Sequence, residues 1–389
     1  MIEPISMLPS DASQATLVGR VWLPGPQGGP TPVLVRDGEV FDLAAIAITL
    51  SELLEMPDPV AAARSVTGPP LGSLQTIQAN AHDPQHMHLL APCDLQPVKA
   101  AGVTFVASML ERVIEERARG DALQAQEIRR AVVALIGDDL SRVRPGSEQA
   151  AKLKALLIER GIWSQYLEVG IGPYAEIFTK APPMSAVGSG SQIGLHPQSS
   201  WNNPEPEVVL AVSSHGRIVG STLGNDVNLR DFEGRSALLL GKAKDNNGSC
   251  AVGPFVRLFD EKFSLDDVRC AELRLDVEGA DGYRLSGSSS MRLISRDPVE
   301  LVAQAMGGTH QYPDGLMLFC GTMFAPTQDR DVAGSGFTHK LGDIVSIQSG
   351  KLGCLVNRVG LSNQIPAWDF GLGALMRSLG RRGLLQSLP

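Results

Sequence analysis

The stretch that decides the fold spans residues 201–254 and reads WNNPEPEVVLAVSSHGRIVGSTLGNDVNLRDFEGRSALLLGKAKDNNGSCAVGP. It opens with two apolar runs of strand length, and His215-Gly216 lies between them as a turn signal. Two such runs around a short turn predict a β-hairpin, which we expect to close through a two-residue loop. That loop sets a register in which Glu205 lies directly opposite Asp226.

The predicted register brings three acidic side chains together. Residues two apart on a strand share a face, so Glu207 points the same way as Glu205 and its cross-strand neighbour Asp226. No Lys or Arg lies within residues 205–212, so a cation is the simplest remedy for the repulsion. Oxygen ligands without Cys or His favour Mg²⁺ first, then Mn²⁺ or Ca²⁺. Spacing alone allows an equally good alternative, in which these are two exposed strand-end acids and an unrelated loop aspartate.

Three small residues follow on the same predicted face of the hairpin. Gly220, Thr222 and Gly224 alternate along its second strand and therefore point toward the side that carries the acids. Because none of them has a bulky side chain, we expect them to leave room for a ligand above a metal ion.

The composition is that of an ordinary globular protein and argues against several classes of partner. The length of 389 residues predicts two domains. The hydrophobic fraction of 43% and the charged fraction of 20% are ordinary for a globular protein. A net charge of −8 without a recurrent basic face argues against nucleic acid. The sequence contains no apolar run of 18 residues that would predict a membrane span, and its start has no signal-peptide pattern. Five scattered cysteines are typical of buried thiols in a reducing compartment, so we expect a cytoplasmic protein.

The chain divides by pattern into two parts. Residues 1–95 predict a small β-rich N-terminal domain, and residues 96–389 a predominantly β catalytic domain with a helical insertion near its start, giving an α+β fold. Helices are predicted over Ala44–Met56, Ser108–Arg119, Leu123–Ile136, Glu148–Arg160 and Pro298–Met306. Besides the hairpin, strands are predicted over Thr16–Trp22, Thr31–Arg36, Glu39–Leu43, Gly102–Phe105, Glu176–Thr179, Val252–Phe259, Glu272–Gly279, Tyr283–Met291, Leu316–Cys320, Ile344–Gln348 and Gly353–Val359. No repeat, GxGxxG loop after a strand or Walker A loop is present.

The motifs PEPEVVLAV and GNDVNLRD, followed by a lysine and the turn at Gly253-Pro254, resemble those of the fumarylacetoacetate hydrolase family. LLAP at 89–92, IFTK at 177–180, Gly321-Thr322 and GDIVSIQSGKLGCLVNRV at 342–359 resemble further family motifs, so the likeness covers about residues 89 to 360. It implies a mixed β-sandwich roll, a homodimer or larger homo-oligomer, and a divalent metal. The implied metal ligands are Glu205, Glu207 and Asp226.

One departure from the family pattern bears on the reaction. Its hydrolases carry a His-x-x-Glu dyad that activates water, whereas here Ser108 stands in the place of the histidine and precedes Glu111. A serine without an adjacent base is a poor activator of water, so hydrolysis is disfavoured. Ser108, Glu176 and Glu233 instead resemble a sugar-acid branch whose members dehydrate 2-keto-3-deoxy sugar acids. A 2-keto-3-deoxypentonate such as 2-keto-3-deoxy-D-arabinonate gives 2,5-dioxopentanoate, a step of pentose catabolism.

Dehydration through a metal-stabilised enolate requires a base, an acid and groups that hold the 2-keto acid. Lys244, in the family's lysine position, is expected to be the base if its pKa is lowered, or else to stabilise the enolate. Glu176 is a candidate acid/base because its apolar flank would raise its pKa, and Glu116 is a weaker second candidate.

Four further residues are expected to bind substrate. They are Arg230, Thr322, Ser108 and Glu233. The plainer alternative for Lys244 and Arg230 is ion pairing with neighbouring acids such as Asp245, Asp231 or Glu233. Glu111, Arg112, Glu115 and Glu116 are predicted to form a solvated helix face.

Other reactions of the same enolate chemistry remain open. They are acylpyruvate hydrolysis, decarboxylation, and aldol cleavage to pyruvate and glycolaldehyde. A role outside catalysis, as a metal-binding relic whose N-terminal part mediates assembly, is a further alternative that the acidic triad with Lys244 and Arg230 argues against.

Overall fold

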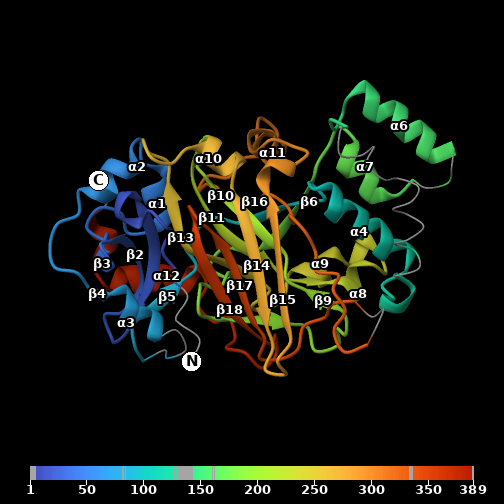
Figure 1. The fold of residues 1–389 in the computed structure, drawn as a ribbon. Helices are drawn as coiled ribbons and strands as arrows, with labels where there is room; N and C mark the ends of the chain where they lie inside the picture. The colour runs from blue at the N-terminus through green and yellow to red at the C-terminus, as the bar shows by residue number, and fades with distance from the viewer. Residues whose placement is uncertain are drawn as a thin grey trace.

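The computed structural model describes residues 6–80, 83, 85–125, 128, 143–159, 161, 163–332 and 336–387. A large sheet is packed against a smaller one, and helices gather at both ends of the sandwich (Figure 1). The large sheet has eleven strands in the order β4 (Gly72–Ser73), β3 (Glu39–Asp42), β2 (Gly29–Arg36), β1 (Leu17–Leu23), β13 (Cys250–Leu258), β11 (Ile218–Asp226), β10 (Pro206–Val212), β16 (Leu316–Phe319), β6 (Val98–Gly102) and β7 (Glu176–Ala181), with β5 (His88–Leu90) on β1.

The second sheet has five strands and supplies the other wall of the main core. Its order is β15 (Arg284–Ser290), β14 (Glu272–Glu278), β17 (Ile344–Ser349), β18 (Gly353–Leu361) and β8 (Gln192–Leu195). Val208, Leu210 and Leu223 of the large sheet share one buried cluster with Leu275 and Ile347 of the small sheet. A two-stranded ladder joins β9 (Asn202–Asn203) to β12 (Asn228–Leu229). The expected mainly β sandwich with helices is confirmed.

The helices lie mainly at the two ends of the sandwich (Figure 1). They are α1 (Leu50–Glu55), α2 (Pro59–Arg64), α3 (Leu74–Ala79), α4 (Val106–Arg117), α6 (Glu148–Glu159), α7 (Gln165–Ile171), α8 (Arg230–Glu233), α9 (Leu240–Lys244), α10 (Leu265–Arg269), α11 (Pro298–Ala305) and α12 (Leu372–Arg381). Among the helices of the described residues, none has the length and apolarity that crossing a membrane requires. All five cysteines are unpaired, and four of them are buried.

The central hairpin has the predicted register. Glu207 lies opposite Gly224, and the backbone N–H of Asp226 donates to the carbonyl of Glu205 at 3.1 Å. The predicted two-residue loop is wrong, because Ser213 pairs with Arg217 across three residues. An irregularity in the ladder at Val212 and Ile218 leaves one extra residue on β11, and this restores the register toward the acids.

The room expected above the hairpin is absent from the described structure around Gly224. A Cβ atom added there would lie 2.2 Å from the Phe319 ring and 2.6 Å from a methyl group of Val209. Gly220 is equally confined, since a Cβ atom would lie 2.4 Å from the Arg257 carbonyl oxygen. These glycines permit close packing in the sheet, so the interpretation as ligand space is wrong.

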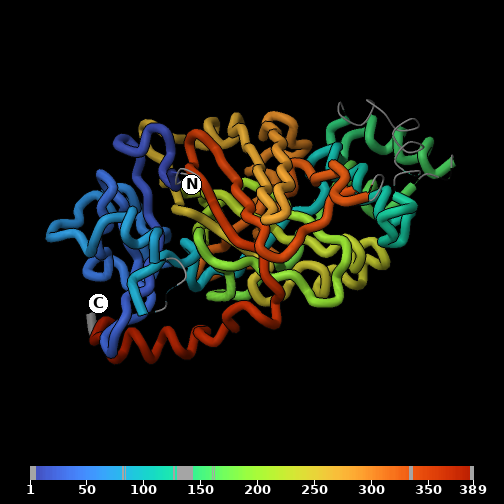
Figure 2. Tube along the Cα trace, turned by 60° about the horizontal axis from the view of Figure 1, so that its bottom comes forward, coloured from blue at the N-terminus to red at the C-terminus, as the bar shows by residue number. Residues whose placement is uncertain are grey.

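The N-terminal strands are continuous with the large sheet. Strand β1 pairs with β13, and Val18 and Leu34 share a buried cluster with Val209 and Phe319. The C-terminal helix α12 returns to the same region and runs along the N-terminal part (Figure 2), where Arg382 donates to the carbonyl of Pro30 at 2.9 Å. The domain boundary near residue 95 stays a prediction.

Most predicted elements are present, and the errors fall near the ends of runs. The strand predicted over Gly102–Phe105 lies earlier in the chain, because β6 ends at Gly102 and Phe105 is the N-cap residue of α4. The helix predicted from Ala44 begins at Leu50, where Thr49 caps it by accepting from the backbone N–H of Glu52. The helix predicted over Leu123–Ile136 lies largely outside the described residues. Among the described residues, seven helices were not predicted, namely α2, α3, α7, α8, α9, α10 and α12.

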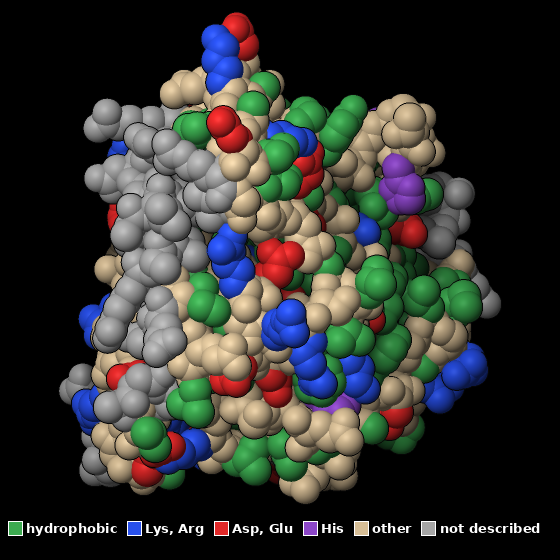
Figure 3. Space-filling view, turned by 90° about the vertical axis from the view of Figure 1, so that its right-hand side faces the viewer, with side chains coloured by type: hydrophobic (Ala, Val, Ile, Leu, Met, Phe, Trp, Pro, Cys, Tyr) green, Lys and Arg blue, Asp and Glu red, His purple; other side chains and the backbone are tan. Residues whose placement is uncertain are grey.

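Charges of both signs alternate with apolar side chains on the helical end of the molecule. Figure 3 shows this face, and the side chains drawn there in colour form no continuous basic surface. This agrees with the net charge of −8.

Gly224→Ala should destabilise the fold by about 1–3 kcal/mol, because its methyl group would overlap the Phe319 ring. The matched control is Gly72→Ala in β4, where a Cβ atom meets nothing within 4 Å. Urea denaturation would measure both free energies of unfolding. Equal values for the two variants would show that Phe319 moves aside at little cost.

Candidate metal centre and active site

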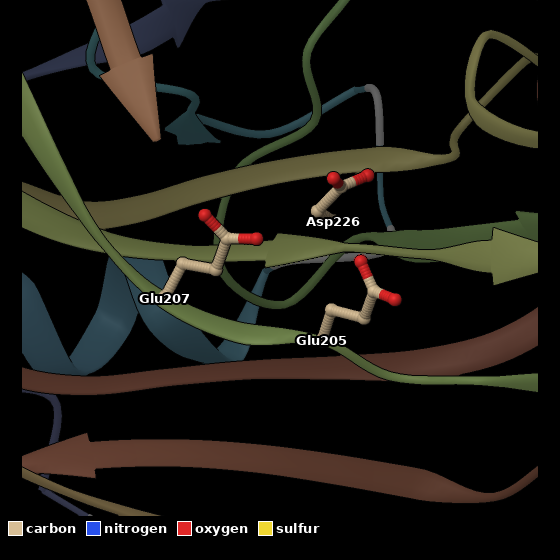
Figure 4. A group of neighbouring side chains, drawn as sticks. All are labelled: Glu205, Glu207 and Asp226. Carbon is tan, nitrogen blue, oxygen red and sulfur yellow. The ribbon is translucent and has the colours of Figure 1, made fainter. Parts of the chain in front are cut away.

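Glu205, Glu207 and Asp226 converge on one point beside the start of β10. One carboxylate oxygen from each residue lies within 4.8 Å of the others, and each residue is 1% exposed. Figure 4 shows Glu205 and Glu207 on one strand segment and Asp226 on its neighbour, with their carboxylates gathered on the same side. The geometric part of the sequence prediction is therefore confirmed, and exposed strand-end acids are excluded.

The acids already have cationic neighbours, which the sequence did not predict. Lys244 pairs with Glu205 and, at 3.1 Å, with Asp226. Lys180 pairs with the other oxygen of Asp226 at 2.7 Å, and Arg112 pairs with Glu205. These cations come from α9, β7 and α4. The expectation of three anions without a cation was wrong because only residues close in sequence had been considered.

Glu207 differs from the other two acids. The described structure gives it two neutral donors, the N–H of Gly321 at 2.7 Å and the hydroxyl of Thr322 at 3.2 Å, and no ion pair. Burial, followed by the charges of Asp226 and Glu205, holds its pKa well above the usual value. A divalent cation among the three acids would compensate this carboxylate, and an all-carboxylate donor set suits a hard ion. The residues present therefore fit a magnesium ion.

Glu205 and Lys244 have opposite shifts in pKa for the same reason. Burial alone would raise the pKa of Glu205, but Arg112 and Lys244 outweigh it and lower that pKa to about 2. Burial alone would lower the pKa of Lys244, but Asp226 and Glu205 raise it above its ordinary value. These acids favour the protonated form of Lys244, which suits the expectation that it stabilises an enolate more than the expectation of a base with a lowered pKa.

A second layer of charges links α4 and α8 to the triad. Arg112 contacts Glu115 and also Glu233, the latter at 3.2 Å, while Arg230 pairs with Glu115 at 2.9 Å. The predicted solvated helix face is wrong for Arg112 and Glu115, which are 5% and 1% exposed. Both flank the buried pair Val113–Ile114, and that position was the available signal.

Arg230 is buried and contacts several protein groups. Besides Glu115, its guanidinium donates to the carbonyl of Pro326 at 3.2 Å and lies over the Trp201 ring at 5.2 Å. The alternative that Arg230 pairs with an acid is confirmed, but the acid is Glu115 of α4 rather than Asp231 or Glu233. Its role toward substrate stays a prediction.

Lys180 is a second residue that sequence reasoning missed. It was recognised only as part of a strand motif, yet it is fully buried and also donates to the carbonyl of Val227 at 3.1 Å. The signal was the strand period. Lys180 shares a face of β7 with Phe178 and Glu176, the candidate acid/base.

Glu176 lies half-buried at the start of β7. Burial, assisted by the nearby charge of Glu233, raises its pKa to about 7, so the expected direction is confirmed. A Cβ atom at Gly102 on the paired strand would lie 1.9 Å from a carboxylate oxygen of Glu176. The absence of a side chain at Gly102 therefore allows this carboxyl group to lie across β6.

The remaining predicted residues occupy different positions. Glu116 accepts hydrogen bonds from Ser164 and Gln165 at the start of α7, so its carboxylate is held at that helix. Ser108 is 2% exposed in the first turn of α4. Thr322 is brought to the triad through Glu207, and Glu233 through Arg112.

Comparison with known proteins identifies the family. The model of the fumarylacetoacetate (FAA) hydrolase C-terminal domain matches residues 168–360. A curated relative, the 2-dehydro-3-deoxy-D-arabinonate dehydratase of Saccharolobus solfataricus, is 31% identical over 227 residues, which cover 58% of this chain and 69% of the relative. The chain belongs to the fumarylacetoacetate hydrolase family.

Other similar proteins include a second curated relative and two solved structures. A probable 2-keto-3-deoxyxylonate dehydratase of Haloferax volcanii is 30% identical over 201 residues, covering 52% of this chain and 65% of that protein. A solved 2-keto-3-deoxy-D-arabinonate dehydratase, complexed with magnesium and 2,5-dioxopentanoate, has a TM-score of 0.61 at 20% identity, over 89% of this chain and 99% of that one. A fumarylacetoacetate hydrolase from Exiguobacterium antarcticum has a TM-score of 0.54 at 16% identity, over 89% of this chain and 100% of that one. The fold is therefore shared across different reactions.

Replacing two of the acids should separate stability from metal binding. Glu205→Gln breaks buried pairs with Lys244 and Arg112, so unfolding free energy without metal should fall by about 3–5 kcal/mol. Glu207→Gln keeps a side-chain oxygen that accepts from Gly321 and Thr322, and it removes a buried carboxylate that has no ion pair among the described residues. The free energy of unfolding without metal should therefore change by less than about 1 kcal/mol.

Both variants should lose the stabilisation that added Mg²⁺ gives to the unmodified chain, because each removes a carboxylate oxygen from the set. Thermal unfolding with EDTA and with Mg²⁺ measures both effects. A Glu207→Gln variant that Mg²⁺ stabilises as strongly as the unmodified chain would contradict the assignment.

Proposed function

We propose that this chain is a magnesium-dependent hydro-lyase that dehydrates a 2-keto-3-deoxy sugar acid, converting 2-keto-3-deoxypentonate to 2,5-dioxopentanoate and water. The observation that carries this proposal is the buried triad of Glu205, Glu207 and Asp226 with cationic Lys244 beside it and a carboxyl group of raised pKa, Glu176, nearby. The relatives that are about 30% identical carry names of dehydratases of such acids.

Each group of the site has a part in this reaction. The three acids would hold Mg²⁺, which when bound supplies a Lewis acid for the carboxylate and keto oxygens of a 2-keto acid. Lys180 and Arg112 orient two of the acids through their ion pairs. Cationic Lys244 stabilises the negative charge that develops on the keto oxygen as the C3 proton leaves.

Glu176 is the proposed base because Lys244 is already protonated. With a pKa of about 7, its carboxylate takes the C3 proton, and the resulting acid then returns that proton to the departing C4 hydroxyl group. The C3–H and C4–O bonds break, a C3–C4 double bond and water form, and tautomerisation gives the aldehyde at C5. One residue thus accounts for the proton balance.

We also propose pentose catabolism as the setting, a homodimer or larger homo-oligomer as the assembly, and the cytoplasm as the location. The substrates in the names of the relatives support the first, the family resemblance the second, and the unpaired cysteines the third. The proposed division at residue 95 assigns the chemistry to residues 96–389.

Incubation of the full chain with Mg²⁺ and 2-keto-3-deoxypentonate should give 2,5-dioxopentanoate, and EDTA should abolish the product. Mass spectrometry of the products distinguishes this outcome from aldol cleavage, which would release pyruvate and glycolaldehyde. Hydrolysis of fumarylpyruvate to fumarate and pyruvate, without action on the deoxy acid, would overturn the proposal in favour of an acylpyruvate hydrolase.

The role of Glu176 predicts a pH profile in which kcat/KM falls below about pH 7, because a base must be ionised. Glu176→Gln should lower kcat by about 100-fold or more and remove that limb of the profile. Gly102→Ala should also lower kcat, since its methyl group would displace the carboxyl group. Glu116→Gln is the matched control and should keep the limb, because Glu116 is bonded to α7. A Glu176→Gln variant with unchanged turnover would remove Glu176 from this role.

A further inference from the structure

A cavity outside the metal centre has the features of a second small-molecule site. It measures about 400 Å³, within the range of about 300–1,000 Å³ that is usual for ligand pockets. Its walls come from the N-terminal strands, the segment after β7 and residues 366–370, which connect β18 to α12. None of the triad residues and none of their cationic partners lines it. We therefore treat it as separate from the proposed active site.

A buried arginine lies in the wall of this cavity. Arg20 is 4% exposed, and its Nη1 donates to the carbonyls of Cys93 and Ala91. Asp94 lies 3.7 Å from its Nε. The partner recorded for Nη2 is the Met184 sulfur at 3.6 Å, and a thioether is a weak acceptor. One edge of the guanidinium group therefore keeps the capacity to bind an anion.

The backbone at Met184 is an independent sign of a built site. This residue has φ of +70°, a left-handed conformation that a side chain with a Cβ atom disfavours. Its backbone N–H donates to the carbonyl of Asp94 at 3.1 Å, which fixes the turn. Such conformations concentrate where a side chain is held for binding, and here the side chain lines the cavity beside Arg20.

Aromatic rings form much of the remaining wall. Trp22 meets Phe370 edge to face at 5.1 Å and stacks with His88 at 6.5 Å between ring centroids. Trp368 is 47% exposed and also lines the cavity, so one large flat ring is available at its rim. Residues 366–370 are held there because the Asn247 side-chain amide donates to the carbonyl of Pro366 at 3.1 Å.

We propose that this cavity binds a small carboxylate with a flat aromatic or apolar body, at a site separate from the metal centre. The carboxylate would pair with Arg20 in a charge-assisted hydrogen bond, and the body would pack against Trp22 and Trp368. A sugar acid fits less well, because the amide nitrogen of Asn247 in the wall is already bonded to two carbonyls and the Asp369 carboxylate in the wall would repel a second anion near it. Its hydroxyl groups would lose hydrogen bonds on entry.

The test is isothermal titration calorimetry of the full chain with naphthalene-2-carboxylate in the presence of EDTA. We expect one site per chain, and at least tenfold weaker binding of the neutral naphthalene-2-carboxamide. Arg20→Met and Trp368→Ala should each weaken binding of the carboxylate at least tenfold. Glu207→Gln should leave it unchanged, because the metal centre does not line the cavity.

Thermal unfolding of each variant controls for loss of structure. Trp368 is half-exposed, so Trp368→Ala remains informative even if Arg20→Met is unstable. Absence of binding, equal binding of the carboxamide, or unchanged binding in Trp368→Ala would overturn the proposal. Loss of binding in Glu207→Gln would assign the probe to the metal centre and would equally overturn it. Tighter binding of an aldonate such as xylonate than of the naphthoate would contradict the aromatic class.

Discussion

The rest of the site depends on compensating buried negative charge at the start of β10. Glu205, Glu207 and Asp226 are almost completely enclosed, where an isolated carboxylate would be protonated rather than ionised. Lys244 and Lys180 supply opposite charge from two other elements. A chain that folds in this way holds three carboxylates ready for a hard cation. The carboxylate without an ion pair, Glu207, is the one whose charge a divalent ion would stabilise most.

The second layer of charge explains how a helix outside the sheet becomes part of the site. Arg112 of α4 pairs with Glu205, and Glu115 pairs with Arg230 of α8. Each arginine lies among acids, so loss of an arginine removes a cationic partner from buried carboxylates. The network joins α4 and α8 to the hairpin and encloses the triad. Ser108 lies in the first turn of α4, on the same helix as Arg112 and Glu115.

Local patterns predicted the elements well where hydrophobic periodicity was strong. The strands of the central hairpin, the helix near 106–117 and the register of Glu207 opposite Gly224 followed from spacing. The length of the loop at His215 was predicted wrongly. An irregularity in the ladder near Ile218 compensates for an extra loop residue, and the sequence carries no clear signal for either feature. Gly224 was misread for a related reason. Whether a glycine leaves space or admits a neighbour depends on Phe319, which lies 95 residues away.

The sequence by itself determined the alternation that puts three carboxylates on one face, since side-chain direction along a strand has a fixed period. It also determined the motifs by which the chain resembles its family. Only the tertiary structure decided which cations meet those acids and which side chains are available to a substrate. Arg112, Lys180 and Lys244 come from three elements far apart in the chain, and their charges, not local sequence, set the protonation of the site. The acids around Lys244 raise its pKa and burial raises the pKa of Glu176, because desolvation and long-range pairing act only in the folded chain.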